Sequence, residues 1–348
     1  MRELLFAPLA FFYRLAVSFR HHLFDWGILK SKKFDIPIIC IGNITVGGTG
    51  KTPMAEMLIA YMMSRHNVAL LSRGYGRRTK GYREVKLTDH YRDVGDEPLQ
   101  IKRKFPDVAV VVCEKRVEGI CRIQAEHPEV NLIIMDDGFQ HRYVDPKVNV
   151  LMVDATRPVQ SDSMLPLGSL RDLPDQFYRV HHFVVTKCPE QMAPIERRIW
   201  RNVLIKYAYQ RIYYTRFECF NPKPIFPDDA SAEPLLKRSR VIALSGIGNP
   251  GPFLKTLNEW YEVAKEVTFD DHHVYLVRDM NMLDALLKEY PDAKIVTTEK
   301  DAVKLMCRPE KISPAVRRAL YYLPINIRFI EDSATDFLQK LEEDVRGN

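Results

Sequence analysis

The chain has 348 residues, enough for about two domains that each bury a hydrophobic core. Hydrophobic residues make up 46% of it and charged residues 28%, and no window reaches the roughly 18 uncharged apolar residues of a spanning helix, which excludes an integral membrane protein. The net charge of +6 does not imply nucleic-acid binding, and six scattered cysteines without a C-x-x-C pair favour reduced thiols in a cytosolic protein over disulfides or a zinc site.

Residues 1–33 are predicted to form a basic amphipathic helix, with six basic and two acidic side chains. Large apolar residues recur through it at helical spacing, at Phe12, Leu15, Phe19, Leu23 and Trp26. Such a helix can lie in a membrane interface, or its aromatic face can pack on the protein's own core, and the segment alone does not separate these alternatives. Its longest uncharged run, residues 4–13, is too short to span a membrane, and no cleavage site indicates a signal peptide.

Residues 34–209 are predicted to form a doubly wound α/β core. Apolar runs that alternate with helical patterns occur at 36–42, 67–72, 108–113, 130–136, 148–154 and 181–187. Continuous β-branched runs are typical of strands buried on both faces, and strands separated by helices form parallel sheets between helical layers. The expected fold class is therefore α/β, with a mostly parallel sheet like that of the P-loop NTPases.

A second, smaller α/β domain is predicted over residues 220–320. A Tyr-rich and then Pro-rich stretch at 207–239 indicates an exposed strand followed by a boundary. The strands expected beyond it are 241–246, 263–269 and 293–298, and the helices are 252–261 and 276–290. Segments 210–219 and 321–330 are expected to pair as a two-stranded link between the domains, and residues 331–348 to form a C-terminal helix.

The strongest motif follows the first predicted strand. It reads Thr45, Val46, Gly47, Gly48, Thr49, Gly50, Lys51 and Thr52. This resembles a P-loop, in which backbone N–H groups hold phosphates at a helix N-terminus, the lysine neutralises phosphate oxygens and the hydroxyl ligates Mg²⁺. Thr45 stands where the usual pattern has glycine, but the strand, loop and helix around it support a nucleotide-phosphate site.

Two carboxylates, Asp136 and Asp137, end the apolar strand 130–136 at the position from which a carboxylate reaches the Mg²⁺ of a bound nucleotide. The alternative is a simple turn at Asp137 that Asp136 caps. Guanine is usually read by an [NT]-K-x-D motif, whereas here Thr186-Lys187-Cys188 is followed by Pro189. ATP is therefore the expected nucleotide.

The loop 72–83, after the second predicted strand, holds five cations and two tyrosines at the edge of the sheet where α/β proteins bind ligands. A solvated loop and nucleic-acid binding are alternatives to a site for a phosphorylated substrate or lipid headgroup. The candidate substrate contacts in it are Arg73, Tyr75, Arg77 and Arg78.

Seven motifs together carry a family resemblance. They are TVGGTGKTP, SRGYGRR, VGDEP (94–98), MDDGFQHR (135–142), PLGSLRD (166–172), FDDHHVY (269–275) and TEKDAVK (298–304). In this order behind an aromatic helix, they resemble the tetraacyldisaccharide 4′-kinases, the lipid A 4′-kinases of Gram-negative bacteria, over essentially the full chain. The resemblance implies transfer of the ATP γ-phosphoryl group, with Mg²⁺, to the 4′-hydroxyl of a tetraacylated glucosamine disaccharide 1-phosphate. It also implies a peripheral protein at the cytoplasmic face of the inner membrane, and we expect a monomer.

The resemblance also implies roles for single residues. Asp96 would accept the proton of the hydroxyl, although it could instead cap a helix, and His272 would reach it from the second domain, with His273 beside it as an ambiguity. The family pattern L-R-E-P is Leu170-Arg171-Asp172-Leu173 here, which suggests that Arg171 contacts substrate and that the shorter Asp172 supports the metal. The T-E-K-D motif, 298–301, receives only a supporting or interdomain role.

Two other functions remain open at this point. One is a P-loop switch ATPase that the N-terminal helix recruits to membranes and that binds a protein partner. The other is a soluble P-loop kinase for a small metabolite, in which the aromatic helix would have no purpose. A base for a hydroxyl acceptor, such as Asp96, has no role in a switch.

Overall fold

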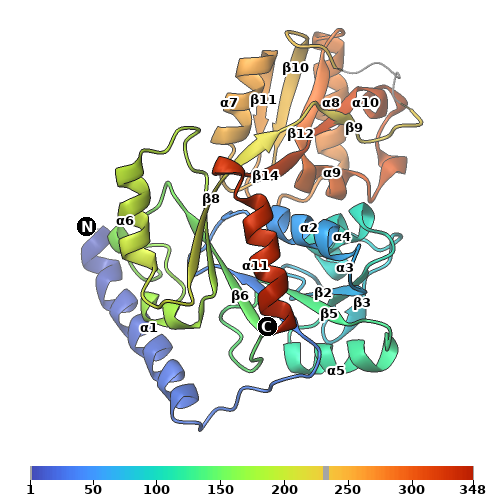
Figure 1. The fold of residues 1–348 in the computed structure, drawn as a ribbon. Helices are drawn as coiled ribbons and strands as arrows, with labels where there is room; N and C mark the ends of the chain where they lie inside the picture. Colours follow the sequence, from blue (N-terminus) through green and yellow to red (C-terminus); the bar gives the residue numbers. More distant parts are fainter. Residues whose placement is uncertain (1, 230–234, 348) are drawn as a thin grey trace.

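The computed structural model describes residues 2–229 and 235–347, in which two α/β units are built on separate sheets (Figure 1). The larger sheet has nine strands in the order β14-β8-β7-β6-β1-β5-β2-β4-β3. The strands are β1 Ile38–Gly42, β2 Val68–Ser72, β3 Arg83–Glu84, β4 Ala109–Val112, β5 Leu132–Asp136, β6 Val148–Asp154, β7 His182–Thr186, β8 Arg211–Cys219 and β14 Ile325–Phe329. The strands from β8 to β4 are all parallel, and β14 and β3 pair antiparallel at the two edges. This confirms the predicted α/β class.

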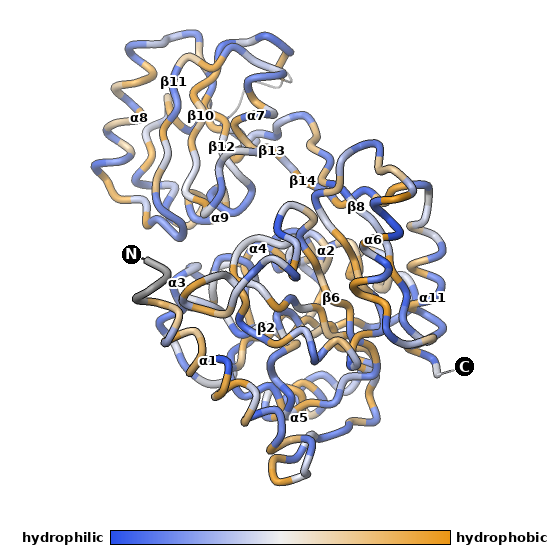
Figure 2. Tube along the Cα trace, turned by 90° about the vertical axis from the view of Figure 1, so that its left-hand side faces the viewer, coloured by the Kyte–Doolittle hydropathy of each residue, from blue (hydrophilic) through white to orange (hydrophobic). Residues whose placement is uncertain are grey.

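Helices cover both faces of the larger sheet. They are α1 Arg2–Asp25, α2 Lys51–Met62, α3 Tyr91–Val94, α4 Asp96–Lys104, α5 Arg116–Glu126, α6 Pro194–Leu204 and α11 Ala334–Arg346. Successive residues of β1 enter opposite cores: Ile39 and Ile41 pack with α2, α4 and α11, whereas Ile38 and Cys40 pack with α5. Burial on both sides explains the continuous apolar runs, which also appear in the hydrophobic colouring of strands such as β6 (Figure 2).

The smaller unit has a five-stranded sheet in the order β11-β10-β12-β13-β9, in which only β9 is antiparallel among the described residues. Its elements are β9 Lys223–Pro224, β10 Arg240–Ser245, α7 Gly251–Trp260, β11 Glu262–Thr268, α8 Val277–Glu289, β12 Lys294–Thr298, α9 Glu299–Leu305, α10 Pro314–Ala319 and β13 Leu320–Leu323. Short 3₁₀ helices lie at Val159–Ser161, Pro174–Arg179, Pro309–Lys311 and Ile330–Asp332.

The chain passes between the two units at two adjacent points. Phe220 N donates to Pro324 O at 3.1 Å, directly after β8 and directly before β14. The expected pairing of 210–219 with 321–330 exists between β8 and β14, but β8 also pairs with β7, so both strands extend the larger sheet and are not a separate link. The first residues of the second segment belong to β13 of the smaller sheet. The exact domain limits stay a prediction.

Helix α1 lies along the outer edge of the larger unit (Figure 1). Phe12, Phe19 and Trp26 are 60–65% exposed, whereas His21 on the polar side is only 2% exposed. His21 Nε2 lies 2.6 Å from Asp172 Oδ1, and Arg142 donates to His21 Nδ1 at 3.0 Å. The polar side of α1 therefore packs against the rest of the protein, because its His21 contacts the buried carboxylate of Asp172. Within the described residues, no helix is long and apolar enough to cross a membrane.

Candidate functional site

The loop between β1 and α2 is shaped by two glycines. Gly47 and Gly50 have φ of 98° and 89°, and a Cβ on Gly50 would lie 2.7 Å from a ring atom of Phe217. Glycine tolerates this left-handed backbone, and here it also avoids a clash. Thr49 between them is fixed, since its hydroxyl accepts from Asn43 Nδ2 at 2.9 Å and its carbonyl accepts from the Thr186 hydroxyl. Residues 46–48 at the tip are exposed, as a loop that holds phosphates requires.

Thr45 can stand where P-loops usually have glycine because the backbone of the loop is extended at this position. Its backbone bridges antiparallel to Leu170, and Val46 N donates to Ser169 O at 2.8 Å. Thr45 is not among the residues with positive φ, so a β-branched side chain is accommodated. The bridge also brings the 166–172 motif to the edge of the loop.

Lys51, the first residue of α2, faces a carboxylate shared with an arginine. Its Nζ lies 3.7 Å from Asp137 Oδ1, and Arg171 donates to both oxygens of Asp137. Burial alone would raise the pKa of Asp137, but Lys51 and Arg171 outweigh this effect and lower the pKa to about 2. Asp137 is therefore held as an anion between two cations.

Asp136, one residue earlier, has the opposite environment. It is 2% exposed, and burial together with the nearby charges of Glu97 and Asp137 raises its pKa to about 7. Ser72 Oγ donates to its Oδ2 at 3.3 Å, but Oδ1 has no hydrogen-bond partner among the described residues. A buried carboxylate oxygen without a partner is costly for the protein, and a bound cation would stabilise it.

The donor set around this carboxylate fits a hard cation that keeps ligands from outside the protein. No group of three or more His, Cys, Asp or Glu side chains in the described part of the chain is close enough to hold a metal by itself. Mg²⁺ is commonly bound by one or two carboxylates, water and phosphate oxygens, so such a group is not required. Thr52, in the first turn of α2, presents the hydroxyl of the P-loop pattern.

The two units meet at Asp96, the first residue of α4. Asp96 is 5% exposed, and its Oδ2 lies 3.3 Å from Nδ1 of His272 and 3.7 Å from Nζ of Lys300, both from the smaller unit. Burial alone would raise the pKa of Asp96, but His272 and Lys300 lower it to about 2. The structure thus brings the predicted pair together and adds Lys300. Gly95, not Asp96, is the N-cap of α4.

The neighbouring residues of the smaller unit have internal partners. His273 stacks on Phe269 and its Nε2 lies 3.0 Å from Asp279 Oδ2, so only His272 faces Asp96. Asp301 is fully buried and accepts from the Thr298 hydroxyl and from Gly246 N. Within the 298–301 motif, Lys300 therefore faces the site, whereas Thr298 and Asp301 hold the fold around it.

The basic loop after β2 divides into structural and exposed residues. Arg77 pairs with Glu114 at 2.6 Å and donates to Gly81 O, so its predicted substrate contact is replaced by a role inside the loop. Tyr75 is exposed, with its ring centre 5.4 Å from that of His272. Arg73 and Arg78 are exposed and have no ion-pair partner among the described residues. A pocket between the units is lined by Tyr75, Arg78, Arg92, Asp96 and His272, among others.

Asp172 does not lie free at the phosphate loop. Its Oδ1 accepts from His21 and from Leu173 N, and its Oδ2 lies 3.3 Å from Gln140 Nε2. Both oxygens are engaged inside the protein, so the expected metal role is replaced by one that holds α1. The sequence did not predict the contact between Asp172 and His21, since 151 positions separate these two residues. Arg171 similarly contacts Asp137 and Asn43, where a substrate contact was expected.

The opposite environments of the two adjacent aspartates give opposite pH dependences. The pKa of Asp136 is higher in the folded protein than in the unfolded chain, where it is near 3.8. Asp136 therefore stabilises the fold at pH values below 3.8, and this contribution is lost as the pH rises through about 7. We therefore expect Asp136→Asn to stabilise the ligand-free protein increasingly from pH 4 to pH 8, by up to about 4 kcal/mol, since each unit of pKa difference corresponds to about 1.4 kcal/mol.

Urea unfolding across this pH range measures the effect. Asp137→Asn is the matched control: a lowered pKa stabilises the fold above pH 3.8, so this variant should be destabilised at neutral pH. A constant difference between Asp136→Asn and the parent from pH 4 to pH 8 would contradict the environment described for Asp136.

Comparisons with known proteins show which family the chain belongs to. A family model, LpxK, tetraacyldisaccharide-1-P 4′-kinase, matches residues 2–345. The tetraacyldisaccharide 4′-kinase of Phocaeicola vulgatus is 38% identical over 98% of this chain and 94% of its own length. That of Flavobacterium johnsoniae is 36% identical over 99% of this chain and 98% of its own.

A solved structure has the same fold. LpxK from Aquifex aeolicus, crystallised in complex with ATP, matches with a TM-score of 0.75 and 26% identity over 99% of this chain and 100% of that one. The family match and the two relatives each cover nearly the whole chain. The protein therefore belongs to the tetraacyldisaccharide-1-P 4′-kinase family.

Proposed function

We propose that this protein transfers the γ-phosphoryl group of ATP to the 4′-hydroxyl of a tetraacylated glucosamine disaccharide 1-phosphate, a step of lipid A synthesis. The observation that carries the proposal is the placement of Asp96. This carboxylate lines a pocket between the units, and its neighbour Glu97 is close enough to Lys51 and Asp137 for their charges to influence its pKa. An acceptor hydroxyl in the pocket would therefore lie beside the phosphate loop.

On the donor side, Lys51 neutralises phosphate charge. Residues 45–52 would hold the phosphates through backbone N–H groups at the N-terminus of α2. Asp137 keeps Lys51 in place when no phosphate is bound. Lys51 can exchange Asp137 for a phosphate oxygen because Arg171 still balances the charge of that carboxylate. Charge neutralisation of this kind contributes most in the transition state of phosphoryl transfer.

Asp136 and Thr52 are the residues that would hold Mg²⁺. Asp136 has a buried oxygen that no other described residue contacts by a hydrogen bond, whereas both oxygens of Asp137 accept from Arg171, so we assign the direct contact to Asp136. When bound, Mg²⁺ would offset negative charge on the phosphates. Its positive charge would also lower the pKa of Asp136 from about 7.

On the acceptor side, Asp96 would take the proton of the 4′-hydroxyl. The O–H bond breaks as its oxygen forms a bond to the γ-phosphorus, ADP leaves, and the proton passes to the carboxylate. With a pKa of about 2, Asp96 is fully ionised at neutral pH but is a weak base, so its main contribution is to orient the hydroxyl. His272 and Lys300 hold Oδ2 of Asp96. Arg73, Tyr75 and Arg78 would contact the phosphorylated sugar of the acceptor.

The exposed side of α1 would lie in the membrane interface, next to the acceptor lipid. Phe12, Phe19 and Trp26 all point away from the protein, so the alternative in which they pack on its own core is excluded for these three. Large aromatic side chains beside basic residues are suited to the interface of an anionic bilayer. A kinase that acts on a small metabolite would not need an apolar surface of this kind. A switch ATPase would not need Asp96, because it has no acceptor hydroxyl whose proton must be taken. We therefore infer a peripheral protein at the cytoplasmic face of the inner membrane.

Transfer of label from γ-labelled ATP to a chloroform-soluble product tests the function. We expect transfer with the tetraacylated 1-phosphate acceptor, and a loss of about a thousandfold in Lys51→Ala, which lacks the charge that stabilises the transition state. Lys255→Ala, which removes an exposed lysine of α7, should be unaffected. Release of free phosphate without a lipid product would favour the switch ATPase instead.

A double-mutant cycle on kcat tests the contact between the units. Asp96→Ala should lower kcat about a hundredfold or more, His272→Ala should lower it less, and the double variant should resemble Asp96→Ala, because His272 acts through the carboxylate. The KM for ATP should change little. His273→Ala is the control, as His273 faces Asp279. Additive losses, or a larger effect of His273→Ala than of His272→Ala, would disprove the pairing.

Flotation with anionic liposomes tests α1. The triple variant Phe12→Ser, Phe19→Ser and Trp26→Ser should bind at least about tenfold more weakly, because each side chain contributes apolar area to the interface. Ile195→Ser with Ile199→Ser removes exposed apolar side chains of α6 and should float like the parent. Equal flotation of the triple variant and the parent would rule out α1 as the membrane contact.

A further inference from the structure

Helix α4 is the part of the larger unit to which the smaller unit is attached by charge. Asp96 Oδ2, at the start of the helix, lies 3.3 Å from His272 Nδ1 and 3.7 Å from Lys300 Nζ. Lys104 Nζ, at its end, lies 3.5 Å from Glu299 Oε1. In the part of the chain that the structure describes, all ion pairs between the two units have α4 as the partner in the larger one. The place of Asp96 therefore depends on what holds α4.

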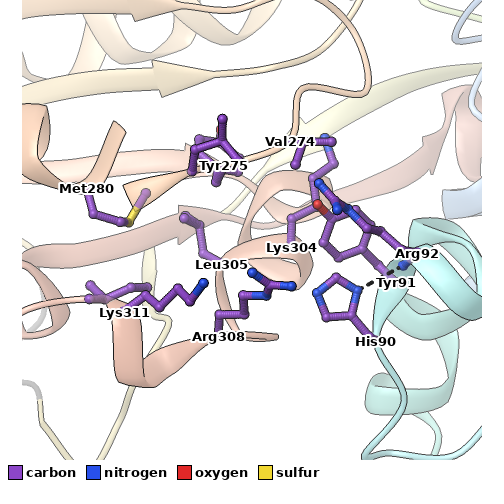
Figure 3. A pocket seen from close by; sticks show the side chains of 12 residues that line it. His90, Tyr91, Arg92, Val274, Tyr275, Met280, Lys304, Leu305, Arg308 and Lys311 are labelled. Atoms are coloured by element: carbon purple, nitrogen blue, oxygen red, sulfur yellow. Dashed lines mark hydrogen bonds between the residues drawn. The ribbon is translucent and has the colours of Figure 1, made fainter. Parts of the chain in front are cut away.

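Beside α4, the two units are separated by a small cavity. It lies between α3 and the end of α9, and Figure 3 shows it from close by. His90 and Arg92 line it from the larger unit, and Leu305 and Arg308 line it from the smaller one. No ion pair between described residues crosses it. The cavity therefore does not fix the units relative to one another, and α4 is the polar anchor between them.

Within the larger unit, one buried carboxylate ties α4 to the helix of the phosphate loop, α2, which lies beside it (Figure 1). Glu56 of α2 is 4% exposed. Gln100 Nε2 donates to its Oε1 at 2.8 Å, and Lys104 Nζ donates to its Oε2 at 2.6 Å. Burial would lower the pKa of Lys104, but the charges of two glutamates beside it raise the pKa, so this lysine stays charged. Glu56 thus connects the helix that begins at Lys51 with the helix that begins at Asp96.

This contact acts on the face of α4 that also carries Asp96. Asp96, Gln100 and Lys104 follow one another at intervals of four residues, so their side chains form one stripe along the helix. Leu99 and Ile101 pack in the hydrophobic core, but apolar packing is non-directional and leaves the helix free to turn slightly. A carboxylate roughly 5 Å from the helix axis moves by about 1 Å when the helix turns by about 12°. Two hydrogen bonds to a single buried carboxylate resist this rotation.

The residues of the smaller unit that contact Asp96 cannot replace Glu56 in this role. His272 and Lys300 belong to the unit that is attached through α4, so they move with the helix and do not fix it relative to α2. Burying a carboxylate is costly, and an apolar side chain at position 56 would avoid this cost. The acidic residue therefore indicates a requirement for direction that apolar packing does not meet.

We propose that Glu56 is a positioning residue for phosphoryl transfer: through Gln100 and Lys104 it sets the rotation of α4, and thereby the place of Asp96 relative to Lys51. The inference rests on the proposed function, because it takes Asp96 to receive the acceptor hydroxyl. A displacement of about 1 Å at a reacting group can lower a rate about a hundredfold. Loss of Glu56 therefore lowers kcat and leaves ATP binding intact.

Transfer of label from γ-labelled ATP to the tetraacylated acceptor tests this role. We expect Glu56→Ala to lower kcat about tenfold to a hundredfold at saturating acceptor, with the KM for ATP unchanged within about twofold, because the phosphate loop itself is unaltered. Glu342→Ala is the matched control. It removes a buried carboxylate of α11 that contacts His66 and Arg346, so it should lower stability but not kcat.

Two further variants separate positioning from stability. In an Asp96→Ala background, Glu56→Ala should cause no further loss of kcat, because the carboxylate that Glu56 positions is already absent. The triple variant Glu56→Leu, Gln100→Leu and Lys104→Met replaces the polar contact by apolar side chains of similar volume, so its urea unfolding should match that of the parent. Its kcat should still fall about tenfold or more, because apolar packing does not fix the rotation of α4.

Three kinetic outcomes would overturn the proposal. They are a parental kcat in the triple variant, multiplicative losses in the cycle with Asp96→Ala, and a rise in the KM for ATP that accounts for the whole loss. Amide hydrogen exchange across residues 96–104, without substrates, does not depend on the reaction. It should be faster in Glu56→Ala than in the parent, and equal exchange would also overturn the proposal. If the parent phosphorylates no lipid while exchange responds as expected, the proposed function fails and the contact between α2 and α4 stands.

Discussion

The structure depends most on the balance of charge around the two carboxylates that end β5. Asp136 and Asp137 lie side by side at the edge of a sheet buried on both faces, where two full negative charges cannot both remain without compensation. Lys51 and Arg171 neutralise Asp137, whereas Asp136 has a raised pKa and an oxygen without a hydrogen-bond partner in the described part of the chain. A bound cation and phosphates would complete this balance, so we infer that the site is suited to these ligands before they bind.

This balance connects parts of the chain that are far apart in sequence. Arg171 is held by the bridge between Thr45 and Leu170, and the next residue, Asp172, is buried against His21 of α1. The Tyr13 hydroxyl donates to Arg171 O at 3.2 Å as well. The helix whose outer face we assign to the membrane is therefore in direct contact, through its inner face, with the segment that positions Asp137. The helix face proposed to contact lipid and the phosphate loop therefore belong to one continuous framework.

The second constraint is the meeting of the two units. Both chain crossings lie at Phe220 and Pro324, so the units are joined at one place and their facing surfaces are otherwise separate pieces of chain. Asp96 draws His272 and Lys300 of the smaller unit toward the larger unit. The attraction at Asp96 therefore brings the two units together beside the pocket that this carboxylate lines.

The sequence by itself determined the α/β class, the strands of the core and the phosphate loop, because buried strands and glycine turns are local signals. The pairing of Asp96 with a histidine was predicted only from the family resemblance. Tertiary structure alone decided which side of α1 docks, that Asp172 and Arg77 serve the fold, that Lys300 faces Asp96, and that β8 and β14 extend the large sheet. Each of these depends on a partner far away in the chain, such as His21 for Asp172, 151 positions apart. A side chain's role follows from which opposite charge the fold brings to it, and no local pattern contains that information.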